Sequence, residues 1–149
     1  MRIMALDVGT VRIGVAISDE LEMGAYPLTT YTRVGSLRRD VAAIQALAAE
    51  QEADAILVGL PTSLNGDEGP QAKFTRVFGD ALARAIGLSV VYWDESMTSV
   101  EAEEQLIAMD YSRQKRRSVL DQWAAKILLD SYLDHRRVSN APRDRLMPD

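Results

Sequence analysis

Two apolar segments near the N-terminus are joined by a very short link, and this pattern constrains the fold more than any other feature of the chain. Residues 2–8 and 12–19 are rich in aliphatic side chains, and the Gly9-Thr10 pair lies between them. Apolar runs of strand length with so short a connection are typical of an antiparallel hairpin. A third run at residues 24–32 extends the predicted hairpin to a three-stranded meander.

After residue 36 the spacing of apolar side chains changes from that of strands to that of helices. Leu37, Val41, Ile44 and then Leu47 or Ala48 mark one face of a helix that is predicted to reach about residue 51. The later predicted elements alternate: a strand at 54–60, a helix from Pro70 to Gly87, a strand at 88–94, a short helix from Thr98 to about Met109, and a final long helix that begins near Ser118. This order predicts an α/β fold with a mixed five-stranded sheet and helices on both faces.

The length and composition of the chain set its broad class. With 149 residues, we expect one domain at residues 1–138 and a polar tail at residues 139–149. No apolar stretch is long enough for a membrane span and no signal peptide pattern is present, so we expect a cytoplasmic protein without membrane partners. The chain has no cysteine, which excludes zinc-thiolate sites, and its one histidine, His135, is expected to be solvated. A monomer and a homodimer both remain open.

Three acidic residues that are far apart in the sequence fall where this topology can bring them together. Asp7 ends the first predicted strand, Glu95 follows the fifth, and Asp121 is expected in the first turn of the final helix. If the first and fourth strands are parallel neighbours and the fifth lies beyond the fourth, Asp7 and Glu95 share one edge of the sheet, and a helix crossing that edge delivers Asp121. Carboxylates without histidine or cysteine suit Mg²⁺ or Mn²⁺. A pair of such ions can support hydrolysis of phosphodiester bonds.

Each acid also has an ordinary structural interpretation. Asp7 could be a turn residue that bonds to its own backbone. Glu95 follows Asp94, and because side chains alternate along a strand, at most one of the two should enter a site. Asp121 could be an acid that favours the start of a helix. Only the combination of the three predicts a metal site.

Positive charge is concentrated near the predicted site although the chain as a whole is acidic. Seventeen basic residues against 22 acidic ones give a net charge of -5, which argues against bulk coating of nucleic acid. Arg113, Lys115, Arg116 and Arg117 form a cluster just before Asp121 and are expected in a loop. The cluster is either a solvated surface or a set of phosphate contacts.

Two further features have alternative interpretations. Asn65 and Gly66 indicate a tight turn, which either approaches the substrate or only joins a strand to a helix. Trp93 and Trp123 could stack on bases, but their apolar surroundings in the sequence favour packing in the core.

Four motifs occur in order along the chain and together resemble one known family. They are residues 7–19, residues 58–61 with Asn65-Gly66 and Gly69, residues 93–99, and residues 121–125. This set resembles the RuvX family, also called YqgF, of Holliday junction resolvases, and the match extends from residue 1 to about residue 133. The resemblance implies a ribonuclease H-like fold with Asp7, Glu95 and Asp121 as catalytic, metal-binding acids. It also implies a nuclease that matures the precursor of 16S ribosomal RNA, with resolution of branched DNA as the older inference for the family.

The chain departs from the family pattern at two basic positions. Val11 precedes Arg12 where the family usually has a lysine, and Ser96 follows Glu95 where the family usually has an arginine. The remaining basic residues expected to hold phosphates are Arg12, Lys115, Arg116 and Arg117. Affinity or substrate preference is therefore expected to differ from that of more basic relatives.

Two hypotheses from other classes remain. The missing basic positions and the acidic charge are compatible with a noncatalytic ribosome-assembly factor that binds nucleic acid. The sequence from Asp7 to Thr10 also resembles the phosphate-binding turn of the actin and sugar-kinase ATPases, but those proteins enclose nucleotide between two such domains, and this chain has room for only one.

Overall fold

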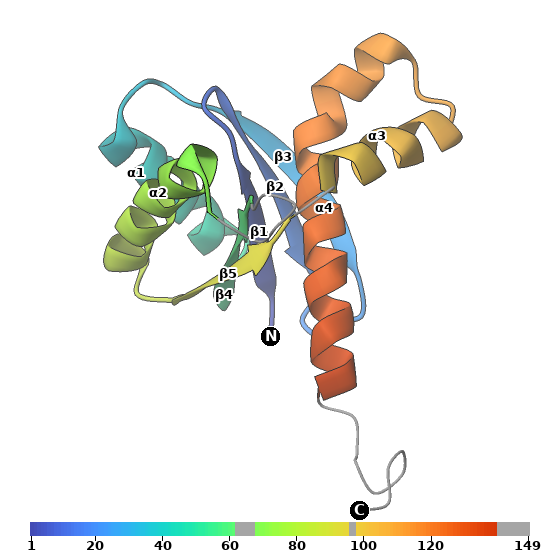
Figure 1. Ribbon diagram of the computed structural model, residues 1–149. Coiled ribbons are helices and arrows are strands. Elements are labelled where there is room, and N and C mark those ends of the chain that lie inside the picture. The colour runs from blue at the N-terminus through green and yellow to red at the C-terminus, as the bar shows by residue number, and fades with distance from the viewer. Residues whose placement is uncertain (62–67, 96–97, 140–149) are drawn as a thin grey trace, which may run out of the picture.

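The computed structural model describes residues 1–61, 68–95 and 98–139, apart from the side chains of residues 98–100 and 117–118, and these residues form a mixed sheet between two layers of helices (Figure 1). The elements follow in the order β1 (Ile3–Val8), β2 (Arg12–Ser18), β3 (Ala25–Thr32), α1 (Leu37–Glu50), β4 (Ala55–Leu60), α2 (Pro70–Ile86), β5 (Ser89–Asp94), α3 (Thr98–Ala108) and α4 (Arg113–Ser139). Of the predicted tail at residues 139–149, Ser139 is the last residue of α4, and residues 140–149 lie outside the described residues. No helix in the described ranges is both long and apolar enough to cross a membrane.

The sheet has the strand order β3-β2-β1-β4-β5, which confirms the predicted α/β fold. β1 pairs with β2, and β2 with β3, in antiparallel fashion, whereas β4 is parallel to both β1 and β5. The central strand β1 therefore carries Asp7 into the middle of the sheet.

Alternation along β1 separates two hydrophobic cores. Met4, Leu6 and Val8 face α1 and α2, where Ile44 and Phe78 pack against them. Ile3 and Ala5 face the other way, toward buried leucines of α4. By the same alternation, Asp7 lies on the α4 face of the sheet.

The helix ends follow from local chemistry. The Ser36 hydroxyl caps α1 by accepting a hydrogen bond from the backbone N–H of Arg39 at 3.3 Å. Pro70 begins α2, and Gly87 ends it in a left-handed conformation with φ 70°. Both helices were predicted with these ends.

The start of α4 was predicted wrongly. The helix begins at Arg113 rather than near Ser118, so the basic cluster forms its first turns instead of a loop, and Asp121 lies in the helix interior. The Ser112 hydroxyl accepts from the backbone N–H of Lys115 at 3.2 Å, and arginine, lysine and glutamine are good helix formers. The polar composition of this stretch, typical of a loop, concealed a capped helix.

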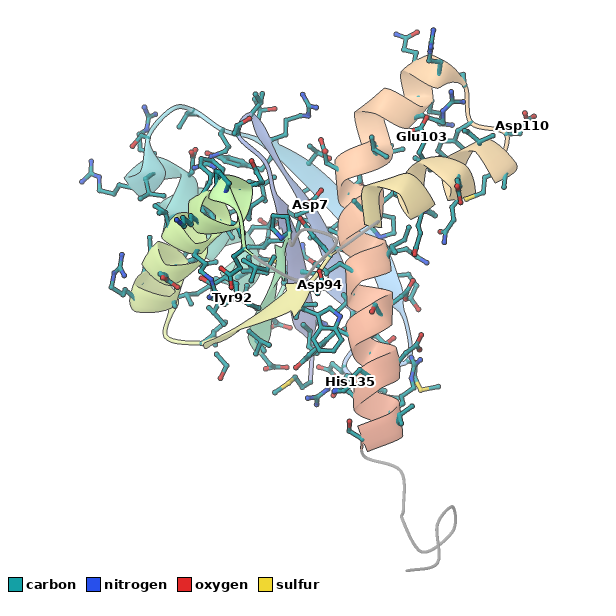
Figure 2. All side chains as sticks on the ribbon, viewed as in Figure 1. Asp7, Tyr92, Asp94, Glu103, Asp110 and His135 are labelled. Atoms are coloured by element: carbon teal, nitrogen blue, oxygen red, sulfur yellow. The ribbon has the colours of Figure 1, made fainter. Side chains whose placement is uncertain are left out.

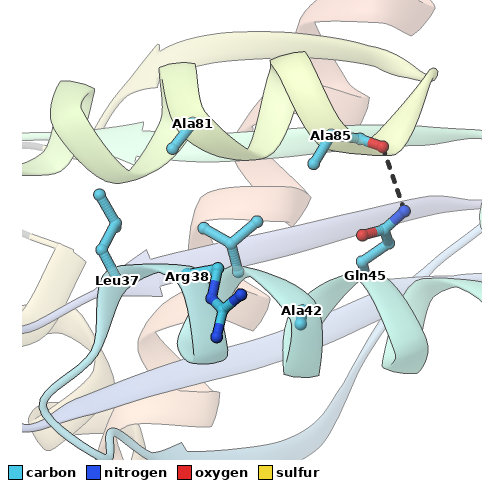
Figure 3. Close-up of a pocket in the computed structure, with 7 residues that line it drawn as sticks. Leu37, Arg38, Ala42, Gln45, Ala81 and Ala85 are labelled. Carbon is cyan, nitrogen blue, oxygen red and sulfur yellow. Dashed lines mark hydrogen bonds between the residues drawn. The ribbon is translucent and has the colours of Figure 1, made fainter.

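The packing of α1 on α2 leaves a shallow groove on the face of the sheet opposite to α4. Figure 3 shows the residues that line it, with the Gln45 side chain donating to the Ala85 carbonyl oxygen at 3.1 Å. The groove has a volume of about 360 Å³ and is lined mainly by aliphatic side chains. It is separated by the sheet from the face that carries Asp7.

A buried ion pair ties α1 to the turn between β1 and β2. Asp40 is 1% exposed and accepts hydrogen bonds from the Arg33 Nε, the Tyr31 hydroxyl and the Val34 N–H at 2.9, 2.9 and 3.0 Å. The guanidinium of Arg33 also donates to the Gly9 carbonyl oxygen at 3.0 Å. It lies 5.3 Å and 5.2 Å from the ring centroids of two phenylalanines on α2, Phe74 and Phe78.

Replacing Asp40 with asparagine is expected to lower the free energy of unfolding by about 3 kcal/mol, because the buried Arg33 charge loses its counter-ion. Urea titration followed by circular dichroism measures the change. Asp134→Asn is the matched control, since Asp134 pairs with Arg137 on the surface, with its side chain 72% exposed. That variant should change stability by less than about 0.5 kcal/mol. Equal effects of the two substitutions would contradict the structural role of Asp40.

Candidate active site

Asp7 and Glu95 meet at the ends of two strands that both run parallel to β4. Asp7 lies near the end of β1, opposite Gly14 of β2. Glu95 directly follows β5, and its backbone N–H donates to the Leu60 carbonyl oxygen at 3.3 Å, which continues the pairing of β4 with β5 by one residue. The two carboxyl groups are hydrogen-bonded to each other. The predicted meeting of these acids at one edge of the sheet is therefore present.

The surroundings of the two acids favour one retained proton. Burial raises the pKa of Glu95 to about 9, and the negative charge of Asp7 adds to the effect. Burial also raises the pKa of Asp7 to about 6, with the hydrogen bond from Glu95 acting in the opposite direction and the charge of Asp121 adding to the rise. At neutral pH, without a cation, Glu95 therefore holds the proton and donates a hydrogen bond to the Asp7 carboxylate.

Gly59 provides the space for Glu95. A Cβ atom on Gly59 would overlap the Glu95 carboxyl group and would lie 2.9 Å from Cδ2 of Leu128. Only a residue without a side chain lets the carboxyl group lie over β4. From the sequence, Gly59 is expected to begin a glycine-rich loop that either approaches the substrate or only joins a strand to a helix. A glycine inside an otherwise aliphatic strand is the signal that could have identified its role.

Gly14 plays the same part for Asp121. A Cβ atom on Gly14 would overlap the backbone carbonyl group of Asp121, and it would lie 2.8 Å from the N atom of Gln122. The α4 backbone thus lies directly on β2, at the residue that pairs with Asp7. This contact brings Asp121 within electrostatic range of Asp7.

Asp121 is held by an arginine from the neighbouring strand. The Arg12 Nε donates to the Asp121 Oδ2 at 2.7 Å, and the side chains of Arg12 and Asp121 are 52% and 25% exposed. Arg12 was predicted to contact phosphates, and the structure places it in contact with one of the three acids.

The oxygen atoms of the site fit a divalent cation. Glu95 Oε2 is buried and has no hydrogen-bond partner among the described residues, which is costly unless another group satisfies it. Asp7, Glu95 and Asp121 offer the hard oxygen donors that Mg²⁺ and Mn²⁺ prefer. Within residues 1–61, 68–95 and 98–139, however, no three acidic side chains are grouped closely enough to hold one ion together. Asp121 would have to move toward the other two acids to share an ion with them.

The other predicted phosphate contacts lie further along α4. We call α3 together with residues 113–120 of α4 the arm, because Figure 1 shows them projecting beyond the sheet. Arg116 links the two helices of the arm, donating to Glu103 at 3.1 Å and to the Tyr111 carbonyl oxygen at 2.8 Å. The Lys115 ammonium lies 4.8 Å from the Tyr111 ring centroid. The Arg117 side chain and the whole of Asn65 lie outside the described residues.

Figure 2 shows Asp7 at the centre of the molecule, with Asp94 at the end of β5, whereas Glu103 lies out on the arm and Asp110 lies in the link between its two helices. Asp94 is exposed and lies close enough to contribute to the raised pKa of Glu95, which results mainly from burial and from Asp7. Glu95 is hydrogen-bonded to Asp7.

The tryptophans pack against the protein rather than projecting into solvent. Trp93 contacts the core beneath α4 and donates from its Nε1 to the Ser131 hydroxyl at 3.2 Å. Trp123 packs on the cluster between α3 and α4, and its Nε1 donates to Gln105 at 3.0 Å. His135 is exposed as predicted, although its ring centroid lies only 4.9 Å from that of Trp93.

A mixed sheet in this strand order, with an acid on its central strand and a second beside it, is typical of the ribonuclease H-like fold. Two solved structures of Thermus thermophilus RuvC share the fold at 15% sequence identity, one of them in complex with a Holliday junction substrate. Their TM-scores are 0.56 and 0.53, with 91% of this chain covered in each case and 95% and 96% of the RuvC chains.

The chain belongs to the RuvX family of Holliday junction resolvases, whose family model matches residues 1–135. A relative from Myxococcus xanthus is 44% identical over 137 residues, which cover 92% of this chain and 90% of the relative. One from Moorella thermoacetica is 46% identical over 134 residues, which cover 90% and 95% of the two chains. Both relatives carry the name "Putative pre-16S rRNA nuclease". The predicted nuclease family is confirmed.

Proposed function

We propose that this protein is a divalent-metal-dependent nuclease that hydrolyses phosphodiester bonds during maturation of the precursor of 16S ribosomal RNA. The unpartnered, buried Oε2 of Glu95 beside Asp7 is the observation that carries the proposal, because a cation would satisfy it. Asp7, Glu95 and Asp121 would hold Mg²⁺ or Mn²⁺, most simply as a two-ion site. Bound there, the metal would activate a water molecule and stabilise the charge that develops on the phosphate.

The residues of the site prepare it for both cation and substrate. Glu95 keeps its proton while the site lacks a cation, so the charge of the two buried acids is partly neutralised. Release of this proton frees both carboxylates as ligands. Gly14 and Gly59 keep the space above the sheet open for Asp121 and Glu95, respectively. Arg12 provides positive charge at the exposed side of the acids, where a phosphate group would approach.

Ribosomal RNA is the substrate class favoured by the names of the relatives, whereas branched DNA is favoured by the name of the family. Arg12, Lys115, Arg116, Arg117 and Asn65 are the proposed contacts to the nucleic acid. For Arg116 this contact would be in addition to its bonds within the arm. A protein that acts on precursor ribosomal RNA would work in the cytoplasm, and this is the location that we propose.

Cleavage of labelled substrates with and without metal tests the proposal. We expect cleavage of a precursor 16S RNA fragment in Mg²⁺ or Mn²⁺, loss of at least about 100-fold of the rate in EDTA, and recovery when metal is restored. A four-way DNA junction and a linear duplex in the same panel compare the two substrate classes. Light scattering on the same preparation measures whether the protein is a monomer or a homodimer. Tight binding without turnover in either metal would instead support the noncatalytic assembly factor.

A further inference from the structure

The ion pair between Arg12 and Asp121 engages an atom that the proposed metal site also needs. It occupies the Oδ2 atom of an acid proposed to bind the cation, at 2.7 Å from the Arg12 Nε. In the same structure Asp7 and Glu95 are hydrogen-bonded to each other, and the acids are not grouped closely enough to hold an ion within the described part of the chain. The ion pair thus keeps one proposed ligand engaged elsewhere.

The backbone that carries Arg12 is firmly held, so the side chain is the part that can move. The Arg12 carbonyl oxygen accepts from the Gly9 N–H at 2.9 Å, which closes the turn between β1 and β2. Arg33 fixes the same turn from the other side, because its N–H donates to the Val11 carbonyl oxygen at 2.8 Å and its guanidinium to that of Gly9 at 3.0 Å. The Arg12 side chain, by contrast, is 52% exposed.

We propose that Arg12 is a positioning residue that exchanges partners during binding: it holds Asp121 away from the other acids in the resting protein and turns to a substrate phosphate when Asp121 binds the cation. The inference rests on the proposed function and adds to it an order of events at the site. A guanidinium group suits this exchange because carboxylate and phosphate oxygens fit its donors equally well. The pair is partly solvated, so breaking it does not leave a buried charge without a partner.

The exchange predicts opposite effects of one substitution on two ligands. Arg12→Gln removes the competitor for Asp121, so Mn²⁺ should bind the substrate-free protein roughly two- to fivefold more tightly. The same substitution removes a phosphate contact, so RNA should bind more weakly, and the slope of affinity against salt should fall by about 1.

Calorimetric titration with Mn²⁺ and fluorescence anisotropy with labelled RNA in EDTA measure the two effects. Arg38→Gln is the matched control, because it makes the same change of charge at an exposed residue of α1, on the opposite face of the sheet. It should leave both affinities unchanged. In nitrogen-15 spectra of the wild-type protein, the Arg12 Nε–H resonance should shift when Mg²⁺, a diamagnetic probe, is added.

The outcomes separate the inference from the function on which it rests. If the wild-type protein binds Mn²⁺ but Arg12→Gln binds it no more tightly, the exchange is wrong and the metal-dependent nuclease stands. If Arg38→Gln tightens Mn²⁺ binding as much as Arg12→Gln does, the effect is one of overall charge and the exchange is again wrong. If neither the wild type nor Arg12→Gln binds Mn²⁺, the proposed function itself fails.

Discussion

Asp7→Asn is expected to abolish metal-dependent cleavage and, at the same time, to stabilise the metal-free protein at pH 8. The loss of activity follows from the central position of Asp7, which is hydrogen-bonded to Glu95 and within electrostatic range of Asp121. An amide keeps the shape of the side chain but removes the charge that a cation needs. We expect a rate at least about 100-fold lower, because stabilisation of charge by a bound metal is worth several kcal/mol, and about 2.7 kcal/mol corresponds to 100-fold in rate.

The gain in stability follows from the sign of the pKa shifts. Asp7 has a pKa of about 6 in the folded protein against an ordinary value of 3.8, and Glu95 has about 9 against 4.5. The folded protein therefore binds more protons than the unfolded chain, from about pH 4 up to about pH 9. Stability from these two acids is fully present at low pH and is lost as the pH rises through this window. Removing the Asp7 charge should restore on the order of 1–2 kcal/mol at pH 8.

Thermal unfolding in EDTA at pH 5 and pH 8, together with cleavage assays, measures both effects of Asp7→Asn. The melting temperature of the wild type should fall more steeply between these pH values than that of the variant. Added Mn²⁺ should stabilise the wild type and have little effect on the variant. Asp134→Asn, at an exposed position on α4, should match the wild type in every measurement. A variant that is less stable than the wild type at pH 8 would show that the Asp7 charge is satisfied within the protein.

Gly14→Ala is expected to damage the site without changing any of its acids. The new Cβ atom would overlap the Asp121 carbonyl group, which is rigid backbone in the interior of α4, so the helix has to move away from β2. Overpacking of this kind lowers the free energy of unfolding by about 1–3 kcal/mol. Because the displaced segment carries Asp121, cleavage should also fall by at least about 100-fold.

The control for Gly14→Ala is Gly24→Ala, in the loop before β3. There the new Cβ atom would lie 3.2 Å from the hydroxyl of Tyr26, at the end of a side chain that is 55% exposed and can turn aside. Chemical denaturation and cleavage assays on both variants, in parallel, separate the effect of the α4 contact from a general effect of alanine in place of glycine. Full activity of a folded Gly14→Ala variant would show that the position of Asp121 does not depend on this contact.

Much of the architecture could be predicted because it depends on local periodicity. The meander, the alternation of strands and helices, and the ends of α1 and α2 at Ser36, Pro70 and Gly87 all follow from apolar spacing and from residues with strong positional preferences. The placement of Asp7 and Glu95 at one edge then follows from the order of the strands. Asp121 was predicted to join them from a helix that begins near Ser118, but the structure places the start of this helix five residues earlier, at Arg113.

The details of the site could not be predicted, because they depend on contacts between elements that are distant in the sequence. Nothing near Gly14 indicates that the backbone of Asp121 will lie on it, and nothing near Arg12 indicates that it will bind that acid. Asp40 is a similar case. Helical spacing places Asp40 beside Val41 without distinguishing it from the other polar residues of α1. Its burial depends on contacts with Tyr31 of β3 and with Arg33, the residue that follows β3.

The continuity of α4 gives the arm a mechanical connection to the site. The helix runs for 27 residues without a break, from the arm to the far end of the sheet, and spans roughly 40 Å. Its backbone contacts Gly14 of β2 at Asp121. Any molecule that grips the arm and tilts it also rotates the backbone that carries this acid. A tilt of the arm would therefore change the position of Asp121 relative to β2.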